Sequence, residues 1–124
     1  MGATGGRHVK DVLVVDDERS LRLLCRVNLE LDGHTVREAG SLAEARRELE
    51  QATPDVILLD VHVGADDGLE LLDELAALDL PTRVVLLSGS SDVGPELRKR
   101  VDMVLGKPFE LDSLAAAVAG SHVR

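Results

Sequence analysis

Asp11-Val12-Leu13-Val14-Val15-Asp16-Asp17-Glu18, residues 11–18, is the most informative segment of the chain. Its apolar middle is continuous rather than alternating, which is typical of a strand buried on both faces of a parallel sheet. Acidic residues follow that run directly. In sheets of this kind, ligands bind beyond the carboxyl ends of the strands. The segment therefore predicts an inner strand with carboxylates at its functional end.

Apolar runs that stop at a polar residue recur further along the chain. They are Val56–Leu59 before Asp60, Val84–Leu87 before Ser88, and Met103–Leu105 shortly before Lys107. Segment 34–39, in which Val36 is apolar, is predicted to form one more short strand. The sequence thus predicts a sheet of five strands.

Amphipathic stretches with helical spacing separate these strands. The first runs from about Glu18 to Leu31, and Gly33 follows as a helix stop. Its apolar stripe is expected at Leu21, Leu24, Val27 and Leu31. The second helix begins at Ser41, whose spacing to Glu44 fits a capping box.

The remaining helices are expected at 68–78, 95–101 and 111–118. The helix at 95–101 is expected to be short, because Gly94-Pro95 interrupts the segment where it should run. Strands that alternate with helices predict an α/β fold. The predicted architecture is a doubly wound, five-stranded parallel sheet with helices on both faces.

The carboxyl ends of parallel strands lie at one edge of the sheet, so the polar residues after them are expected to meet. These residues are Asp16, Asp17, Asp60, Ser88 and Lys107. Carboxylates that cluster without a cation repel one another and raise their own pKa values. Mg²⁺ resolves that conflict, because it prefers oxygen ligands and keeps several waters. We expect Asp17 and Asp60 to be direct ligands and Asp16 to act through a water.

A carboxylate beside Mg²⁺ can attack phosphorus and form an acyl phosphate. Lys107 could then pair with one phosphoryl oxygen and Ser88 could donate a hydrogen bond to another. Taken singly, these residues have ordinary structural explanations: acidic residues favour a helix N-terminus, and a lone lysine is usually solvated. Their joint placement at four strand ends favours the phosphoryl site.

Composition restricts the function classes. The chain has 124 residues, which fits one domain, and a net charge of −9. An acidic domain has no basic surplus for binding nucleic acid, and one aromatic residue, Phe109, does not suit a base-stacking or flavin site. No apolar run is long enough to span a membrane. The single cysteine, Cys25, is expected to be a small buried residue.

The chain resembles the receiver domains of bacterial two-component response regulators over most of its length, from about Val9 to Val118. The resemblance depends on five strings: Val14-Val15-Asp16-Asp17-Glu18, Leu58-Leu59-Asp60, Asp67-Gly68-Leu69-Glu70-Leu71, Leu87-Ser88-Gly89 and Lys107-Pro108-Phe109. It implies a flavodoxin-like fold with strand order 2-1-3-4-5. It also implies a flexible leader at 1–8, a receiver domain at 9–120 and a tail at 121–124.

The resemblance implies a role for each site residue. Asp60 is expected to be the phosphoacceptor, Asp16 and Asp17 the acidic pair that holds Mg²⁺, and His62 the residue whose backbone carbonyl completes the metal shell. Ser88 and Lys107 are expected to contact the phosphoryl group, and the Lys107-Pro108 bond is expected to be cis. The donor would be a sensor histidine kinase or a histidine phosphotransfer protein. The output would pass to a protein target or to an output domain outside this sequence, in the cytoplasm and without direct contact to nucleic acid or membrane.

Two features depart from the family pattern. Val104 occupies a position where an aromatic side chain is common, and Gly94-Pro95 shortens the fourth helix. They leave open a second interpretation, a receiver-like module that binds a protein partner without phosphorylation. A third, a small enzyme such as an aspartyl-phosphate phosphatase or a flavin protein, is disfavoured by His62 two residues after Asp60 and by the lack of a phosphate-binding loop after the first strand. The domain is expected to catalyse only its own phosphorylation and dephosphorylation.

Overall fold

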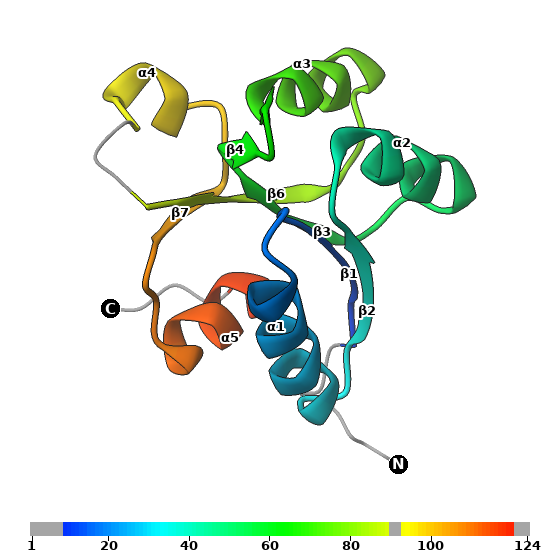
Figure 1. Cartoon of the computed structure of the whole chain (residues 1–124), viewed down its shortest axis with the longest axis vertical. Coiled ribbons are helices and arrows are strands. Elements are labelled where there is room, and N and C mark those ends of the chain that lie inside the picture. Colours follow the sequence, from blue (N-terminus) through cyan, green and yellow to red (C-terminus); the bar gives the residue numbers. More distant parts are fainter. Residues whose placement is uncertain (1–8, 90–92, 121–124) are drawn as a thin grey trace.

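A five-stranded parallel sheet forms the centre of the computed structural model, which describes residues 9–89 and 93–120 (Figure 1). Its strand order is β2-β1-β3-β6-β7, and every neighbouring pair is parallel. Counted within this sheet alone, that is the predicted order 2-1-3-4-5. The strands are β1 (Asp11–Val15), β2 (Thr35–Ala39), β3 (Val56–Asp60), β6 (Arg83–Ser88) and β7 (Met103–Gly106).

Helices cover both faces of the sheet. In Figure 1, α1 and α5 lie below the sheet, and α2, α3 and α4 lie above it. Their bounds are α1 (Arg19–Leu31), α2 (Leu42–Gln51), α3 (Leu69–Leu78), α4 (Pro95–Arg98) and α5 (Leu111–Ala119). The predicted doubly wound architecture is therefore confirmed.

The sheet separates two hydrophobic cores, because successive side chains of a strand point to opposite faces. On one face Leu13 and Val15 of β1 pack with α2 and α3. On the other face Val12 and Val14 pack with α1 and α5. All four side chains are fully buried. This two-sided burial explains why the inner strands have continuous apolar runs.

The predicted apolar stripe of α1 is wrong at three of its four positions. Leu24, Val27 and Leu31 are exposed, whereas Cys25 and Leu29 are buried against the sheet. The helix carries more apolar residues than one face can bury, so several stripes fit the spacing equally well. Contact with the sheet selects the stripe that contains Cys25 and Leu29, and Cys25 is the small buried residue that the sequence predicts.

The predicted helix ends are confirmed at α1 and α2. Gly33 has φ +96°, a conformation that suits the glycine after a helix. At α2 the Ser41 hydroxyl accepts a hydrogen bond from the Glu44 amide at 3.1 Å. The Glu44 carboxylate in turn accepts one from the Gly40 amide at 2.7 Å. This arrangement holds the end of β2 against the start of α2.

A short hairpin between β3 and α3 is a feature that the sequence did not predict. It pairs β4 (His62–Val63) with β5 (Asp66–Asp67) in antiparallel register, and Gly64 occupies a left-handed conformation with φ +63°. Each strand has two residues, which is too short for an alternating pattern to be visible in the sequence. The hairpin places His62 beside the end of β3.

The fourth helix is short, as predicted, but it has four residues and ends at Arg98 instead of extending to the predicted residue 101. Val104 lies in β7 and packs, partly buried, against the core on the α2–α3 face. The expected leader at 1–8 and the expected tail at 121–124 lie outside the described residues. In the described part of the chain, no helix has the length and hydropathy needed to cross a membrane.

Candidate functional site

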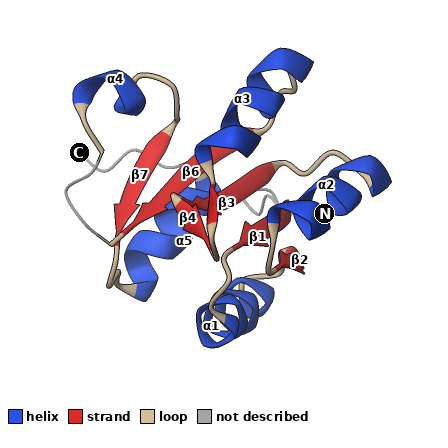
Figure 2. Ribbon diagram, turned by 45° about the horizontal axis from the view of Figure 1, so that its top comes forward, coloured by secondary structure: helices blue, strands red, loops and turns tan. Residues whose placement is uncertain are grey.

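Four strands bring polar residues to one edge of the sheet. In the view of Figure 2 the strands run side by side toward that edge. Asp60 and Ser88 are the last residues of β3 and β6, while Asp16 and Lys107 directly follow β1 and β7. The sequence expectation that these strand ends meet is confirmed by direct contacts among three of the side chains.

Asp16 is fully buried and held on both carboxylate oxygens. Its Oδ1 accepts a hydrogen bond from the Glu18 amide at 2.9 Å, and its Oδ2 accepts one from Lys107 Nζ at 2.7 Å. A carboxylate with both oxygens already engaged has little freedom to turn. This favours the predicted role of Asp16, which is to act on a cation through a water.

Asp60 is also buried, with 8% of its surface exposed. Its Oδ2 accepts a hydrogen bond from Lys107 Nζ at 3.1 Å, and its Oδ1 accepts one from the His62 amide at 3.3 Å. Burial raises the pKa of Asp60, and the negative charge of Asp16 adds to the increase; the hydrogen bond and charge of Lys107 and the His62 amide offset part of it. The Asp60 carboxylate is therefore poorly compensated when it is ionised.

Lys107 joins the two buried carboxylates through one ammonium group. Burial alone would lower the pKa of Lys107, but hydrogen bonds to Asp16 and Asp60 outweigh burial and raise it. The Lys107-Pro108 bond is cis, as the resemblance implied. The Lys107 amide donates to the Ser88 carbonyl at 2.7 Å, so the residue is held at its backbone as well as at its ammonium group.

Asp17 completes an acidic cluster that fits a divalent cation. One carboxylate oxygen each from Asp16, Asp17 and Asp60 lies within 4.8 Å of the others. Three negative charges face the single positive charge of Lys107, so a dication would balance the cluster. The donors are all oxygens, which suits Mg²⁺ better than softer metals. Asp17 is exposed, so an ion that keeps several waters could be bound there from solvent.

Ser88 lies at the end of β6 and His62 lies two residues after Asp60, so both are near the site. Their contacts with the phosphoryl group and the metal remain predictions. Ser88 is buried, 4% exposed, and lies opposite Gly106 in the β6–β7 register. The His62 side chain is exposed, and its amide faces Asp60. The role of the His62 carbonyl as a metal ligand is not tested by these contacts.

Gly68 is a supporting residue that sequence reasoning missed. Its amide donates to the Val61 carbonyl at 2.7 Å, and a Cβ at this position would lie 2.0 Å from the Asp60 carbonyl oxygen. Only glycine allows the start of α3 to approach β3 this closely. The Asp67-Gly68 pair within one of the quoted strings was the available signal.

Comparison with known proteins gives a consistent result. Residues 12–119 match the response regulator receiver domain family. The chain is 36% identical over 110 residues to the transcriptional regulatory protein PrrA of Mycobacterium tuberculosis, covering 86% of this chain and 47% of PrrA. The chain therefore spans about half the length of that relative.

Two solved structures are similar to this chain over most of its length. The receiver domain of the Francisella response regulator 1452 has a TM-score of 0.80 and 30% identity, with 88% of this chain and 93% of that chain covered. A response regulator from Burkholderia pseudomallei, solved with a phosphorylated aspartic acid, a calcium ion and citrate, has a TM-score of 0.77 and 29% identity, with 88% and 66% covered. On the family match and the shared fold, this chain belongs to the receiver domains of two-component response regulators.

Proposed function

We propose that this receiver domain is a Mg²⁺-dependent phosphoacceptor that receives a phosphoryl group on Asp60 and thereby switches the binding of a partner. The observation that carries the proposal is the contact of Lys107 Nζ with both Asp16 and Asp60, at 2.7 and 3.1 Å, inside a cluster of three carboxylates. Receiver domains generally bind Mg²⁺. Asp17 and Asp60 would hold the ion directly, Asp16 through a water, and the His62 carbonyl would add a further oxygen.

In the proposed reaction an Asp60 carboxylate oxygen attacks the phosphorus of a phosphohistidine. A P–O bond forms, the P–N bond breaks, and the imidazole leaves with the electron pair. The bound cation supplies neutralisation of the charge on the phosphoryl oxygens. Lys107, already within reach of Asp60, would pair with a phosphoryl oxygen. The hydroxyl of Ser88, at the end of the neighbouring strand, would donate a hydrogen bond to a second phosphoryl oxygen.

Related proteins support the choice of donor and of acceptor. Response regulators similar to this chain are phosphorylated by histidine kinases. The similar Burkholderia protein carries a phosphorylated aspartic acid together with a divalent cation. We infer that a sensor histidine kinase or a histidine phosphotransfer protein is the donor here, in the cytoplasm. The output would be a protein target or a further domain, and the chain itself would catalyse only its own phosphorylation and dephosphorylation.

Intact-mass measurement after incubation with acetyl phosphate and Mg²⁺ tests the proposal. The wild type should gain the mass of one phosphoryl group, and Asp60→Asn should gain none. Chelation of Mg²⁺ should prevent the gain. The proposal fails if the wild type stays unmodified, or if Asp60→Asn is modified as fully as the wild type.

A second function, binding of a protein partner without phosphorylation, is favoured by two observations. Val104 lies at the position in β7 where the family commonly has an aromatic side chain, and α4 has four residues. In the family, an aromatic side chain at this position couples the site hydroxyl to the surface near the fourth helix. Both features weaken that coupling here, which would run from Ser88 to the surface around α4. This function predicts partner binding that is equally strong in the wild type and in Asp60→Asn, and it fails if the substitution abolishes binding.

A further inference from the structure

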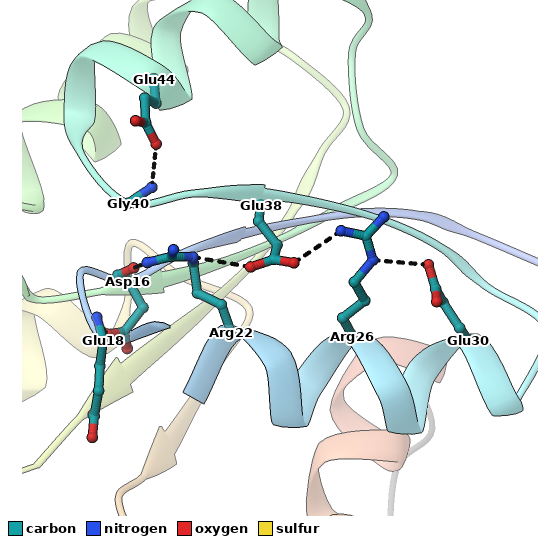
Figure 3. Close-up of polar contacts among 8 residues, drawn as sticks. All are labelled: Asp16, Glu18, Arg22, Arg26, Glu30, Glu38, Gly40 and Glu44. Atoms are coloured by element: carbon teal, nitrogen blue, oxygen red, sulfur yellow. Dashed lines mark hydrogen bonds and ion pairs between the residues drawn. The ribbon is translucent and has the colours of Figure 1, made fainter. Parts of the chain in front are cut away.

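Arg22, near the start of α1, belongs to a polar network that includes the backbone of Asp16 (Figure 3). Its Nε donates to Glu38 Oε1 at 3.0 Å, and its Nη1 donates to the backbone carbonyl of Asp16 at 2.8 Å. Its side chain is 17% exposed, so both contacts are largely shielded from water. One guanidinium thus ties β2 to the loop between β1 and α1.

The Asp16 carbonyl belongs to the peptide unit that leads into Asp17. The Asp16 amide donates to the Ala39 carbonyl at 3.1 Å, and its two carboxylate oxygens are held by Glu18 and Lys107. The hydrogen bond from Arg22 is therefore what fixes the remaining polar atom of Asp16. Because a peptide unit is planar, fixing this carbonyl also sets the direction in which the chain enters Asp17.

The surroundings of Arg22 are shaped to hold it in place. A Cβ added at Gly40 would lie 3.0 Å from Arg22 Nη1 and 3.4 Å from its Cζ, so the glycine leaves the space that the guanidinium occupies. The Gly40 amide is itself fixed by Glu44 at 2.7 Å. Glu38 is shared, because Arg26 Nη1 donates to its other oxygen at 2.9 Å.

We propose that Arg22 is a positioning residue for the metal site: it holds the Asp16–Asp17 peptide in the orientation that presents the Asp17 carboxylate to the cation. The inference rests on the proposed Mg²⁺-dependent function. Among the described residues, the Arg22 side chain donates to the Asp16 carbonyl and to Glu38 rather than to the carboxylates of the site, so it acts on the cation through the β1–α1 loop. Hydrogen bonds behind metal ligands commonly change metal affinity by about 10–100-fold.

Charge and positioning predict opposite signs for the loss of Arg22. Removing a positive charge near a cation site strengthens cation binding if charge alone acts. If positioning acts instead, releasing the Asp16–Asp17 peptide weakens cation binding. Arg26 provides a matched control, because it lies on the same helix and binds the same Glu38, while its hydrogen bonds go to Glu30 and Glu38 instead of the Asp16 carbonyl.

The test is a Mg²⁺ titration of the full chain in which binding is monitored through the backbone amide NMR signals. The thermal midpoint of each variant checks that it is folded. Arg22→Ala should bind Mg²⁺ roughly tenfold more weakly than the wild type. Arg22→Lys keeps the charge but loses the two-nitrogen fork, so it should also bind more weakly. Arg26→Ala should bind like the wild type.

Gly40→Ala gives a second route that changes no charge. Its methyl group would lie 3.0 Å from Arg22 Nη1, so the guanidinium must shift away from the Asp16 carbonyl, and Mg²⁺ binding should weaken again. The inference is overturned if folded Arg22→Ala binds Mg²⁺ as tightly as the wild type or more tightly, if Arg22→Lys is indistinguishable from the wild type, or if Arg26→Ala weakens binding as much as Arg22→Ala. Absence of Mg²⁺ binding by the wild type would instead contradict the proposed function itself.

Discussion

At the scale of single residues, the Asp60 carboxylate is an unfavourably placed charge. Burial and the charge of Asp16 raise its pKa in the folded chain. A carboxyl with a higher pKa when folded binds its proton more tightly in the native state than in the unfolded state. Ionisation of Asp60 therefore lowers the stability of the domain when no cation is bound.

Asp60→Asn should consequently raise the thermal midpoint at neutral pH in the presence of a chelator. In a domain of this size, 1 kcal/mol corresponds to roughly 4 °C. The advantage of the variant should appear as pH rises through the interval between the unfolded and folded pKa values of Asp60, because the wild type loses stability there. Thermal melts of both proteins across pH check this. A variant that melts below the wild type at neutral pH would contradict it.

Lys107 is predicted to serve the phosphoryl group rather than the cation. Lys107→Ala removes a positive charge that contacts both Asp16 and Asp60, so Mg²⁺ binding should be retained or strengthened. Phosphorylation should slow by about a hundredfold, as for the loss of other groups that stabilise developing charge. Metal titration and the time course of intact mass measure the two effects separately. Loss of Mg²⁺ binding would show that Lys107 supports the metal site instead.

The positions of the site residues were predictable from the sequence where they depend on strand ends alone. Asp16, Asp60, Ser88 and Lys107 each end or follow an apolar run, and the parallel sheet brings these strand ends to one edge. Arg22 was not predictable, because its partners are a backbone carbonyl and a residue of another strand. Such contacts leave no spacing pattern in the chain.

At the scale of elements, α1 shows how packing chooses between equivalent patterns. Cys25 and Leu29 are buried, while Leu24, Val27 and Leu31 are exposed. Seven of the eleven residues from 21 to 31 are apolar, so spacing alone did not define one face. Packing against the sheet buries the face of α1 that carries Cys25 and Leu29.

A pair of substitutions in α1 tests that assignment. Leu29→Ala should lower the free energy of unfolding by about 2–5 kcal/mol, because it leaves a cavity beside the sheet. Leu31, with 78% of its surface exposed, should tolerate Ala with a change within about 0.5 kcal/mol. Urea denaturation measures both. Equal losses for the two variants would contradict the observed orientation of the helix.

The β4–β5 hairpin marks the limit of sequence-based prediction at this scale. It is formed by pairs of residues, and its position depends on the close approach of Gly68 to the Asp60 carbonyl. By contrast, the inner strands β1, β3 and β6 of the main sheet were predictable, because burial on both faces requires continuous apolar runs. The difference lies in burial: His62, Asp66 and Asp67 are exposed.

At the scale of the whole molecule, the sheet assembles a site that no local segment contains. Lys107 and Asp16 lie 91 positions apart in the chain, yet their side chains meet at 2.7 Å. The strand order β2-β1-β3-β6-β7 places the ends of β1, β3, β6 and β7 side by side. Three of the acidic residues, Asp16, Asp17 and Asp60, meet there.

A crystal structure of the domain with Mg²⁺ and trifluoroberyllate, a tetrahedral mimic of the phosphoryl group, would examine this assembled site as a whole. We expect the mimic on an Asp60 oxygen, the cation on Asp17 and Asp60, and Lys107 Nζ in contact with a fluorine atom. A mimic bound at any other residue, or a cation held away from these two carboxylates, would show that the strand ends do not form the proposed phosphoryl site.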